Sequence, residues 1–417
     1  MGKQYDVIIV GAGAAGLIAA ISASQKGASV LLLEHMESAG KKILVTGNGK
    51  CNFTNMKQGI SYYRGSDPAF VLPVMEQFGI KETLTFFETL GIYPQNKRDG
   101  YFYPASGQSS SMVQVLLLAC KKQKVTIQYN IGIRSIQKQN ELFVFNTKQE
   151  QFQGSTCIIA TGGKSGKKTG SDGSGIPYIR SLGHHMTDMV PALVQLQGKQ
   201  SFLKEIAGIR AENKVELYID GKKIAEDTGE LQLTEFGVSG IPIFQISRFA
   251  SYGLSQGKKV FVQLNFLPSF TLEEVQSLLE KRFLTYGEGK TSHESLIGLF
   301  PEKLIGVLLK EAGIVPTSKA THCKRQSLIT LSECIQHLHV DIVGTKGFES
   351  AQVTAGGVNT KEILANSMES VLLSGLYFAG EVVDIDGMCG GYNLQWAWSS
   401  GWVAGSHAAQ KAQQKQN

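Results

Sequence analysis

The stretch Tyr5-Asp-Val-Ile-Ile-Val-Gly-Ala-Gly-Ala-Ala-Gly-Leu-Ile-Ala-Ala20 decides the fold of this chain. It begins with an apolar run that ends at Val10, and glycines follow at positions 11, 13 and 16. In the βαβ unit that binds dinucleotides, the first glycine makes a tight turn, the second lets the backbone approach a pyrophosphate, and the third lets the next helix pack closely. The stretch therefore predicts a Rossmann-like α/β domain, with a helix from about Ala14 whose N–H groups face the phosphates.

An acidic residue follows at the distance that this unit requires. Residues 30–33 form a second apolar run, and Glu34 at its end lies eighteen residues after Gly16. An acid at this point accepts hydrogen bonds from the ribose hydroxyls of an adenosine. The complete order of strand, glycines, helix, strand and acid predicts a dinucleotide site that includes Gly11, Gly13, Ala14, Ala15, Gly16 and Glu34.

Two further segments have the composition of cofactor-binding loops. The first, Gly40-Lys-Lys-Ile-Leu-Val-Thr-Gly-Asn-Gly-Lys-Cys-Asn-Phe-Thr-Asn55, is too polar for a core, and its small residues allow a backbone to lie along a cofactor. The second is a buried strand that begins near 156 and ends in a glycine turn; ligands bind at the carboxyl ends of such strands. The candidate contacts in these segments are Lys42, Gly47, Asn48, Gly49, Cys51, Asn52, Ala160, Thr161, Gly162 and Gly163.

The end of the chain predicts a second helix that begins at glycines. A strand that ends in Phe378-Ala-Gly-Glu381 precedes Asp386-Gly-Met-Cys-Gly-Gly-Tyr-Asn393 and a helix from about 394 to 409. The positive end of a helix dipole favours negative charge, and a reduced flavin carries its charge on one edge of the ring. An NAD dehydrogenase has no need of this second helix start, so the pattern favours FAD. The candidate contacts are Gly380, Glu381, Gly390, Gly391, Tyr392, Asn393 and Leu394.

A change of pattern divides the chain into domains. With 417 residues, 42% of them hydrophobic, the chain exceeds the roughly 300 residues at which single cores stop growing. From about 195 the sequence shows short alternating segments typical of a β-rich insertion, and residues 271–312 within it have helical spacing. We predict an FAD-binding domain at 1–194 and 347–417, a β-barrel-like insert at 195–269 and 322–346, and a small helical subdomain at 270–321.

Cysteine usage and hydropathy predict a cytoplasmic protein. The six cysteines include no Cys-x-x-Cys pair and are too sparse for a disulfide framework. No signal-peptide pattern is present, and no apolar run approaches about 18 residues, so we expect no membrane segment.

We also expect no metal, because His322, Cys323, Cys334, His337 and His339 match no metal-finger spacing and the last two are expected on a strand.

Four motifs resemble those of a known family, the BaiN/RdsA-type FAD flavoproteins. They are the N-terminal glycine motif, the Gly40–Asn55 loop quoted above, Gly229-Glu-Leu-Gln-Leu-Thr-Glu-Phe-Gly-Val-Ser-Gly240, and the ending from Phe378 through Asn393-Leu-Gln-Trp-Ala-Trp-Ser-Ser-Gly401. The likeness runs nearly end to end. It implies a glutathione-reductase-type FAD domain interrupted by a β-barrel with a small helical insert. It also implies reduction of carbon–carbon double bonds conjugated to a carbonyl, in oxidised bile acids or in a uridine of ribosomal RNA; an amine-oxidase label is associated with the family as well.

This chemistry predicts that reduced flavin delivers a hydride to the carbon β to a carbonyl while an acid protonates the α carbon. Cys389, Tyr392 and Cys51 are the candidate acids, and the alternative is that all three only pack against the flavin. Because the chain contains one glycine motif of this kind, we expect NAD(P)H to act as a transient electron donor without a nucleotide domain of its own.

The formal net charge of +6 favours a uridine in ribosomal RNA as the substrate, with Lys167 and Lys168 among the phosphate contacts. The lysines also fit a merely solvated surface, which leaves a small conjugated carbonyl compound open. An oxidase that passes electrons to oxygen and a flavin-bearing RNA-binding protein are further alternatives. The oligomeric state stays open.

Overall fold

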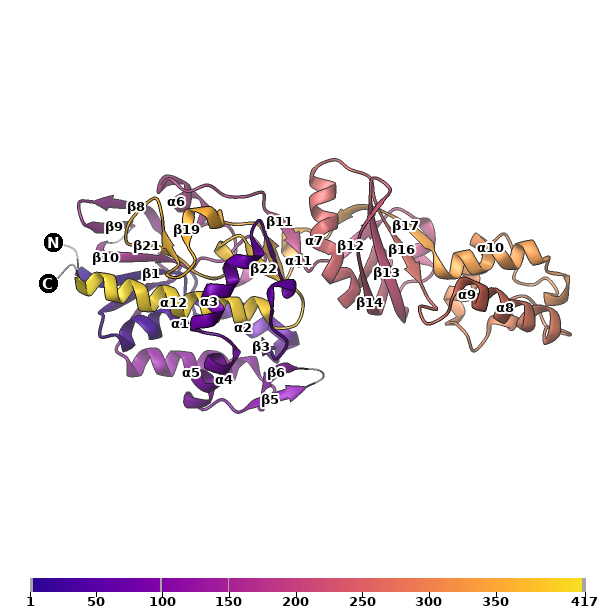
Figure 1. Cartoon of the computed structure of the whole chain (residues 1–417), viewed down its shortest axis with the longest axis horizontal. Coiled ribbons are helices and arrows are strands. Elements are labelled where there is room, and N and C mark those ends of the chain that lie inside the picture. The colour runs from indigo at the N-terminus through magenta and orange to yellow at the C-terminus, as the bar shows by residue number, and fades with distance from the viewer. Residues whose placement is uncertain (1–2, 98–99, 149, 415–417) are drawn as a thin grey trace. The chain divides into compact units, whose positions relative to one another are not determined.

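A computed structural model describes residues 3–97, 100–148 and 150–414. By its internal contacts the chain divides into two compact units, one formed by Met1–Met189 with Gln352–Asn417 and the other by Val190–Ala351. The first unit is thus built from both ends of the chain, and the second from its middle (Figure 1).

The first unit contains a nine-stranded sheet whose centre is parallel. Its parallel strands follow the order β7-β2-β1-β10-β21, with bounds Thr126–Gln128, Val30–Leu33, Lys3–Val10, Gln151–Ile159 and Leu376–Phe378. Antiparallel strands complete it: β8 (Ile133–Gln139), β9 (Leu142–Thr147), β19 (Ile363–Leu364) and β20 (Glu369–Ser370). The predicted Rossmann-like fold is confirmed, since β1 lies between its two parallel neighbours and its last four residues are buried.

Two helices pack closely beside this sheet. Helix α1 (Ala14–Gln25) lies against the long α12 (Tyr392–Gln414), as Figure 1 shows. Glycines make the approach possible, because a Cβ placed on Gly401 or Gly405 would lie 2.4 or 2.3 Å from a carbonyl oxygen of α1. The other helices of the unit are α2 (Lys41–Val45), α3 (Leu72–Gln77), α4 (Ile80–Thr89), α5 (Ser109–Lys122) and α6 (Ile176–Ser181).

The polar segment 40–55 is not the continuous loop that its composition suggests. Its first part forms α2 and a short 3-10 turn (Thr46–Gly49), and its last two residues form β3 (Thr54–Asn55). Strand β3 pairs with β6 (Tyr101–Pro104), which forms a hairpin with β5 (Pro94–Lys97). Strand β4 (Tyr63–Gly65) pairs with β22 (Ile385–Gly387), so segments from the two ends of the chain meet here. The remaining short strand of the unit is β18 (Val353–Ala355).

The second unit contains a closed barrel of six strands in the order β12-β15-β14-β13-β16-β17. The bounds are Leu196–Gly198, Gly237–Gly240, Lys222–Thr234, Arg210–Ile219, Val260–Asn265 and Leu338–Thr345. Buried and less buried residues alternate along β16, as expected for a barrel wall with one face in a core. Helix α7 (Ile241–Ser255) packs on β14, and the unit also includes β11 (Val190–Ala192) and α11 (Gly347–Ser350).

A helical segment continues the hydrophobic core of this unit. It comprises α8 (Leu272–Glu280), α9 (Glu302–Glu311) and α10 (Arg325–Gln336). Helix α8 begins with the reciprocal hydrogen bonds of a capping box, in which Thr271 N donates to Glu274 Oε2 (2.8 Å) and Glu274 N donates to Thr271 Oγ1 (3.2 Å).

Two predictions for this segment are wrong. Residues 325–336 form a helix where we predict barrel, although Leu328, Leu331 and Ile335 have the spacing of a buried helix face. His337 ends this helix, so only His339 lies on a strand.

No helix among the described residues is long and apolar enough to span a membrane. Those residues also contain no group of three or more His, Cys, Asp or Glu side chains arranged to hold a metal ion.

Candidate functional site

The turn between β1 and α1 and the first turn of α1 contain two glycines that packing requires. Gly11 has a φ of +101°, and a Cβ on it would lie 2.5 Å from the carbonyl oxygen of Ala160, which directly follows β10. A Cβ on Gly16 would lie 1.8 Å from the carbonyl oxygen of Gly11. Any side chain at either position would push helix and strand apart, so these glycines serve the fold itself.

Gly13 lies in the same turn and has no such reason to be glycine. Its φ of −80° suits any residue, and a Cβ there would meet nothing within 4 Å. It caps α1, whose first turn carries no acidic residue and whose start is not capped by a side chain. The N–H groups of Gly11 and Ala12 already donate to Leu33 O (2.8 Å) and to the Glu34 carboxylate (2.7 Å), whereas the space beside Gly13, at the positive end of a helix dipole, is open. A glycine that leaves room here fits a bound pyrophosphate.

Glu34 lies beside this turn. Its carboxylate accepts hydrogen bonds from the N–H groups of Ala12 (2.7 Å) and Met36 (2.8 Å), and His35 Nδ1 lies 3.1 Å from its Oε1. Burial raises the pKa of Glu34, but the hydrogen bonds from His35, Met36 and Ala12 outweigh it and leave the pKa below its ordinary value. An ionised acceptor is thus fixed where the sequence places a ribose contact.

Lys42 and Glu381 come from opposite ends of the chain and form an ion pair of 2.5 Å. The other carboxylate oxygen of Glu381 accepts the N–H of Thr354 (2.9 Å). A Cβ on Gly163 would come within 2.9 Å of that oxygen, so the turn after β10 also lies here. Both partners of this ion pair are cofactor contacts predicted from the sequence, and in the structure they join α2, β18 and the turn after β10.

The tryptophans of α12 hold two of the loops. Trp396 Nε1 donates to the carbonyl of Gly380 (3.0 Å), and Trp398 Nε1 donates to the carbonyl of Phe53 (2.9 Å). Gly380 lies close to α1, because a Cβ on it would come within 2.8 Å of Ala15 Cβ. The motif Leu394-Gln-Trp-Ala-Trp398 therefore fixes backbone beside the first glycine turn.

The segment from Gly47 to Asn52 adopts an unusual backbone. Gly47, Asn48, Gly49 and Cys51 all have positive φ, between 53° and 80°. For Asn48 and Cys51 this left-handed conformation is uncommon, and such strain is concentrated at functional sites. Asn52 lies at the start of α12, since a Cβ on Gly391 would come within 3.1 Å of its side chain and 2.9 Å of the Thr54 carbonyl.

Gly390 and Gly391 open α12 with φ values of +132° and +95°. Asn55 Nδ2 donates to the carbonyl of Gly390 (3.0 Å), which ties this start to the first polar segment. Asn393 exchanges hydrogen bonds with the backbone of Gly387, at 2.8 and 2.7 Å. The side chain of Asn393 therefore shapes its own turn, and Leu394 is half-buried in the first turn of the helix.

The three candidate acids differ in access to solvent. Cys51 is fully buried, and burial raises the pKa of its thiol to about 12. Tyr392 is buried, its ring stacks on Tyr62 at 4.7 Å, and burial raises the pKa of its phenol. Cys389 is partly exposed. The geometry thus argues against Cys51 as a proton donor, because a small molecule has no access to it.

Thr161 and Gly162 lie where β10 ends, at the start of a glycine-rich loop that runs to Gly175. The hydroxyls of Thr161 and Ser171 are buried and have no hydrogen-bond partner among the described residues. Gly162 lies against Ser171, since a Cβ on it would be 2.9 Å from that hydroxyl. Buried polar groups are normally satisfied, so these two hydroxyls indicate that a partner is missing at this loop.

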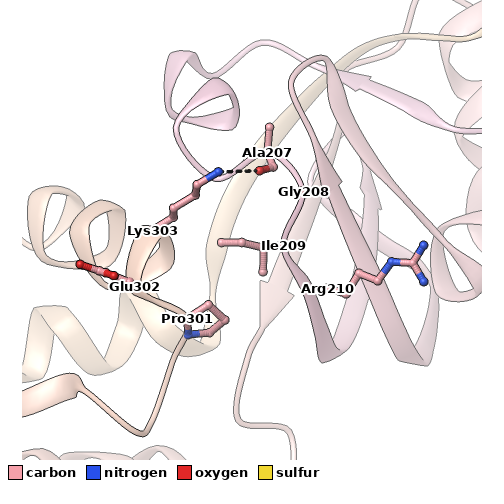
Figure 2. A pocket seen from close by; sticks show the side chains of 7 residues that line it. All are labelled: Ala207, Gly208, Ile209, Arg210, Pro301, Glu302 and Lys303. Carbon is pink, nitrogen blue, oxygen red and sulfur yellow. Dashed lines mark hydrogen bonds between the residues drawn. The ribbon is translucent and has the colours of Figure 1, made fainter.

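These features together fit FAD. Open space at Gly13, an ionised Glu34, two unpartnered hydroxyls and a second helix start lie in one unit, which holds every cofactor contact predicted from the sequence. A pocket in the other unit is lined by Ala207, Gly208, Ile209, Arg210, Pro301, Glu302 and Lys303 (Figure 2). None of the predicted site residues lines that pocket.

Comparison with known protein families decides the assignment. The family model described as HI0933-like protein Rossmann domain matches residues 5–407. The chain belongs to this family. It is an FAD-dependent oxidoreductase, as the Rossmann-type fold and the reductases among its relatives indicate.

Relatives of two kinds match nearly the whole chain. The 3-dehydro-bile acid delta(4,6)-reductase of Clostridium scindens is 42% identical over 97% of this chain and 98% of its own length. The ribosomal RNA dihydrouridine synthase of Haemophilus influenzae is 30% identical over 97% of this chain and 98% of its own length. Among solved structures, a flavocytochrome c3 fumarate reductase in its open conformation has a TM-score of 0.54 at 18% identity and covers 98% of this chain and 79% of its own. At that identity the likeness shows the fold alone.

The structure adds site residues that the sequence reasoning missed. Thr354 Oγ1 accepts the N–H groups of Lys164 (2.8 Å) and Ser165 (3.1 Å) and so fixes the loop after β10. Tyr62 stacks on Tyr392, and His35 lies between Glu34 and Asp172. Among these, only His35 has a signal in the sequence, because it directly follows Glu34, the predicted ribose contact.

Proposed function

We propose that this FAD-dependent oxidoreductase reduces a carbon–carbon double bond conjugated to a carbonyl. The observation that carries the proposal is that two full-length relatives with different substrates are both named for saturating such a bond: a bile-acid delta(4,6)-reductase and a dihydrouridine synthase. When bound and reduced by the electron donor, FAD would supply the hydride that this reaction needs.

The residues of the chain have separate roles in this proposal. The turn at Gly11, Gly13 and Gly16 binds the pyrophosphate, and Glu34 binds the ribose. The start of α12 at Gly391 offers N–H groups to negative charge on the flavin ring, because its first turn contains no acidic residue.

Cys389 is the proposed proton donor to the carbon α to the carbonyl. It precedes the helix start at Gly390, and among the three candidates it alone is not buried. An acid must come within hydrogen-bond reach of the atom that it protonates, and the thiol of Cys51 is fully buried. Tyr392 is proposed to support the site through its stack on Tyr62.

NAD(P)H is the proposed electron donor. Only one turn of the β1–α1 kind is seen in the part of the chain that the structure describes, and we assign it to FAD. The nicotinamide nucleotide is therefore expected to bind briefly, react and leave.

A uridine in ribosomal RNA is the substrate that we favour. Its C5=C6 bond is conjugated to the C4 carbonyl, and the net charge of +6 suits a polyanion. Lys167 and Lys168 support this choice, because both are exposed and neither has an acidic partner among the described residues.

A small conjugated 3-oxo compound is the second candidate. The bile-acid reductase, at 42%, is more similar to this chain than the dihydrouridine synthase at 30%. On this alternative the lysines only keep the surface solvated.

One experiment separates the two substrates. Ribosomal RNA from a strain that lacks the protein is digested to nucleosides and analysed by mass spectrometry. We expect loss of dihydrouridine, restored by the wild-type gene and not by a Gly13→Val variant. Unchanged dihydrouridine, together with turnover of a steroid-like 4-en-3-one by the purified protein, would support the second candidate.

A further inference from the structure

His35 lies between two carboxylates that belong to different parts of the cofactor site. Its Nδ1 is 3.1 Å from Glu34 Oε1, and its Nε2 is 3.6 Å from Asp172 Oδ2. Glu34 directly follows β2, whereas Asp172 lies in the glycine-rich loop that follows β10. One imidazole ring thus joins the ribose-binding acid to a distant loop.

The sheet order determines the path of that loop. Strands β10 and β2 lie on opposite sides of β1, and all three are parallel. A loop that leaves the end of β10 must therefore pass over the end of β1 to reach His35, and the Gly11–Gly16 turn begins there. The contact is close, because a Cβ on Gly170 would lie 3.2 Å from His35 Cε1. The loop crosses the proposed phosphate site.

We propose that His35 is a positioning residue for the cofactor, whose ring holds the Gly162–Gly175 loop over the bound phosphates by joining Glu34 to Asp172. Of the two unpartnered hydroxyls, that of Ser171 lies in this loop and that of Thr161 lies directly before it. Holding the loop closed keeps these hydroxyls beside the FAD site and slows the departure of FAD. The proposal rests on FAD binding and is independent of the substrate.

The protonation state of His35 controls this link. When the ring is protonated, each nitrogen carries a hydrogen that faces a carboxylate. When it is neutral and donates Nδ1–H to Glu34, the lone pair of Nε2 faces Asp172 and the attraction is lost. The hydrogen bond to Glu34 raises the pKa of His35 above its ordinary value of 6.5, although burial opposes this. The link is therefore present at low pH and is lost as the pH rises through that raised pKa.

Three other titratable groups near the His35 ring change charge outside the pH range in which His35 loses its proton. Burial raises the pKa values of Glu34 and Asp172, but hydrogen bonds outweigh it and lower them below 4.5 and 3.8. Burial raises the pKa of Tyr129 above 10.0. Lys41 opposes protonation of His35 by its charge, and it forms an ion pair with Glu37 at 2.6 Å.

The test is the rate at which FAD leaves the holoprotein, followed as the rise of flavin fluorescence after dilution at pH 6 to 9. We expect the wild-type rate to rise roughly two- to fivefold across this range, since partly exposed ion pairs contribute modestly. Asp172→Asn and His35→Gln should release FAD at a rate that does not change with pH and that is close to the wild-type rate at pH 9.

His185→Gln is the matched control. His185 also pairs with a carboxylate of the same unit, Glu362 at 2.7 Å, and should keep the wild-type pH dependence when replaced. If His35→Gln loses FAD during purification, Asp172→Asn decides, because its partly exposed side chain makes the change mild. A wild-type rate that is independent of pH, or an Asp172→Asn protein with the wild-type pH dependence, would overturn the proposal. Wild-type protein without any FAD would instead contradict the cofactor site itself.

Discussion

Helices α1 and α12 both begin at glycines with no acidic residue in the first turn, yet the two starts differ in what surrounds them. Around Gly13, at the start of α1, a Cβ would meet nothing within 4 Å. Around Gly391, at the start of α12, a Cβ would lie within about 3 Å of the Thr54 backbone. One helix start is open, whereas the other packs against strand β3.

This difference shows that the same glycine-rich pattern serves two physical purposes. At Gly13 the glycine leaves space for a ligand, and the protein chain does not need it for folding. At Gly391 the positive φ of +95° and the adjacent strand demand glycine even without a ligand. A substitution at Gly13 should therefore reduce cofactor binding without lowering the stability of the fold. A substitution at Gly391 should reduce both.

The largest expected effect is that of Gly13→Val. A side chain there occupies the proposed pyrophosphate position, so the purified protein should be colourless and contain at least roughly tenfold less FAD by its absorbance near 450 nm. Its circular dichroism and melting temperature should match those of wild-type protein stripped of FAD. Gly16→Val is the contrast, because it forces α1 away from β1 and should prevent folding. Normal FAD content in Gly13→Val would mean that the open space is not the cofactor site.

Cys389→Ala tests the chemistry at the covered helix start. We expect the variant to keep its FAD and its reduction by NAD(P)H and to lose on the order of 10² to 10⁴ in the rate of the substrate step. Cys51→Ala is the matched control and should change that rate little, because the thiol is fully buried. If stopped-flow traces showed that Cys51→Ala slows the substrate step more than Cys389→Ala does, Cys51 would be the acid.

Gly391→Ala should lower the free energy of unfolding by about 1 to 3 kcal/mol, since it adds left-handed strain to a close contact with Thr54. Gly183→Ala is the matched control for strain alone, because Gly183 has a φ of +90° and no atom within 4 Å of its Cβ position. Denaturant unfolding of both proteins checks the difference. Equal losses would show that the contact with β3 is unimportant.

The smallest expected effect is that of replacing two exposed lysines on the surface. Replacing Lys167 and Lys168 together by alanine should reduce the slope of log affinity for ribosomal RNA against log salt by up to about 1.4, from roughly 0.7 for each single-stranded phosphate contact. FAD content should not change. An unaltered slope would show that these lysines do not contact RNA phosphates. It would not affect the comparison of the two helix starts.

Much of this site was predictable because its rules are local. The turn at Gly11–Gly16 and the acid at Glu34 follow from spacing within one βαβ unit, and the structure has the predicted strands and helix. The pair Thr271 and Glu274 likewise identifies a helix start from four adjacent residues.

The other contacts of the site could not be predicted, because they join segments that lie far apart in the sequence. Lys42 and Glu381 are 339 positions apart, and nothing in either segment identifies the other as its partner. The roles of Trp396 and Trp398 as donors to loop carbonyls, and the link of His35 to Asp172, arise only when the sheet order is known. Helix α10 is different, because the helical spacing of Leu328, Leu331 and Ile335 is local, yet we predict part of the barrel for these residues.

A single-turnover experiment tests the central claim most directly. The FAD of the purified protein is reduced with dithionite under strict anaerobiosis and mixed with ribosomal RNA from the deletion strain or with a steroid-like 4-en-3-one. We predict that one of these compounds restores the oxidised flavin spectrum and yields one saturated bond per flavin, with RNA the favoured partner. A flavin that stays reduced with both compounds would contradict the account.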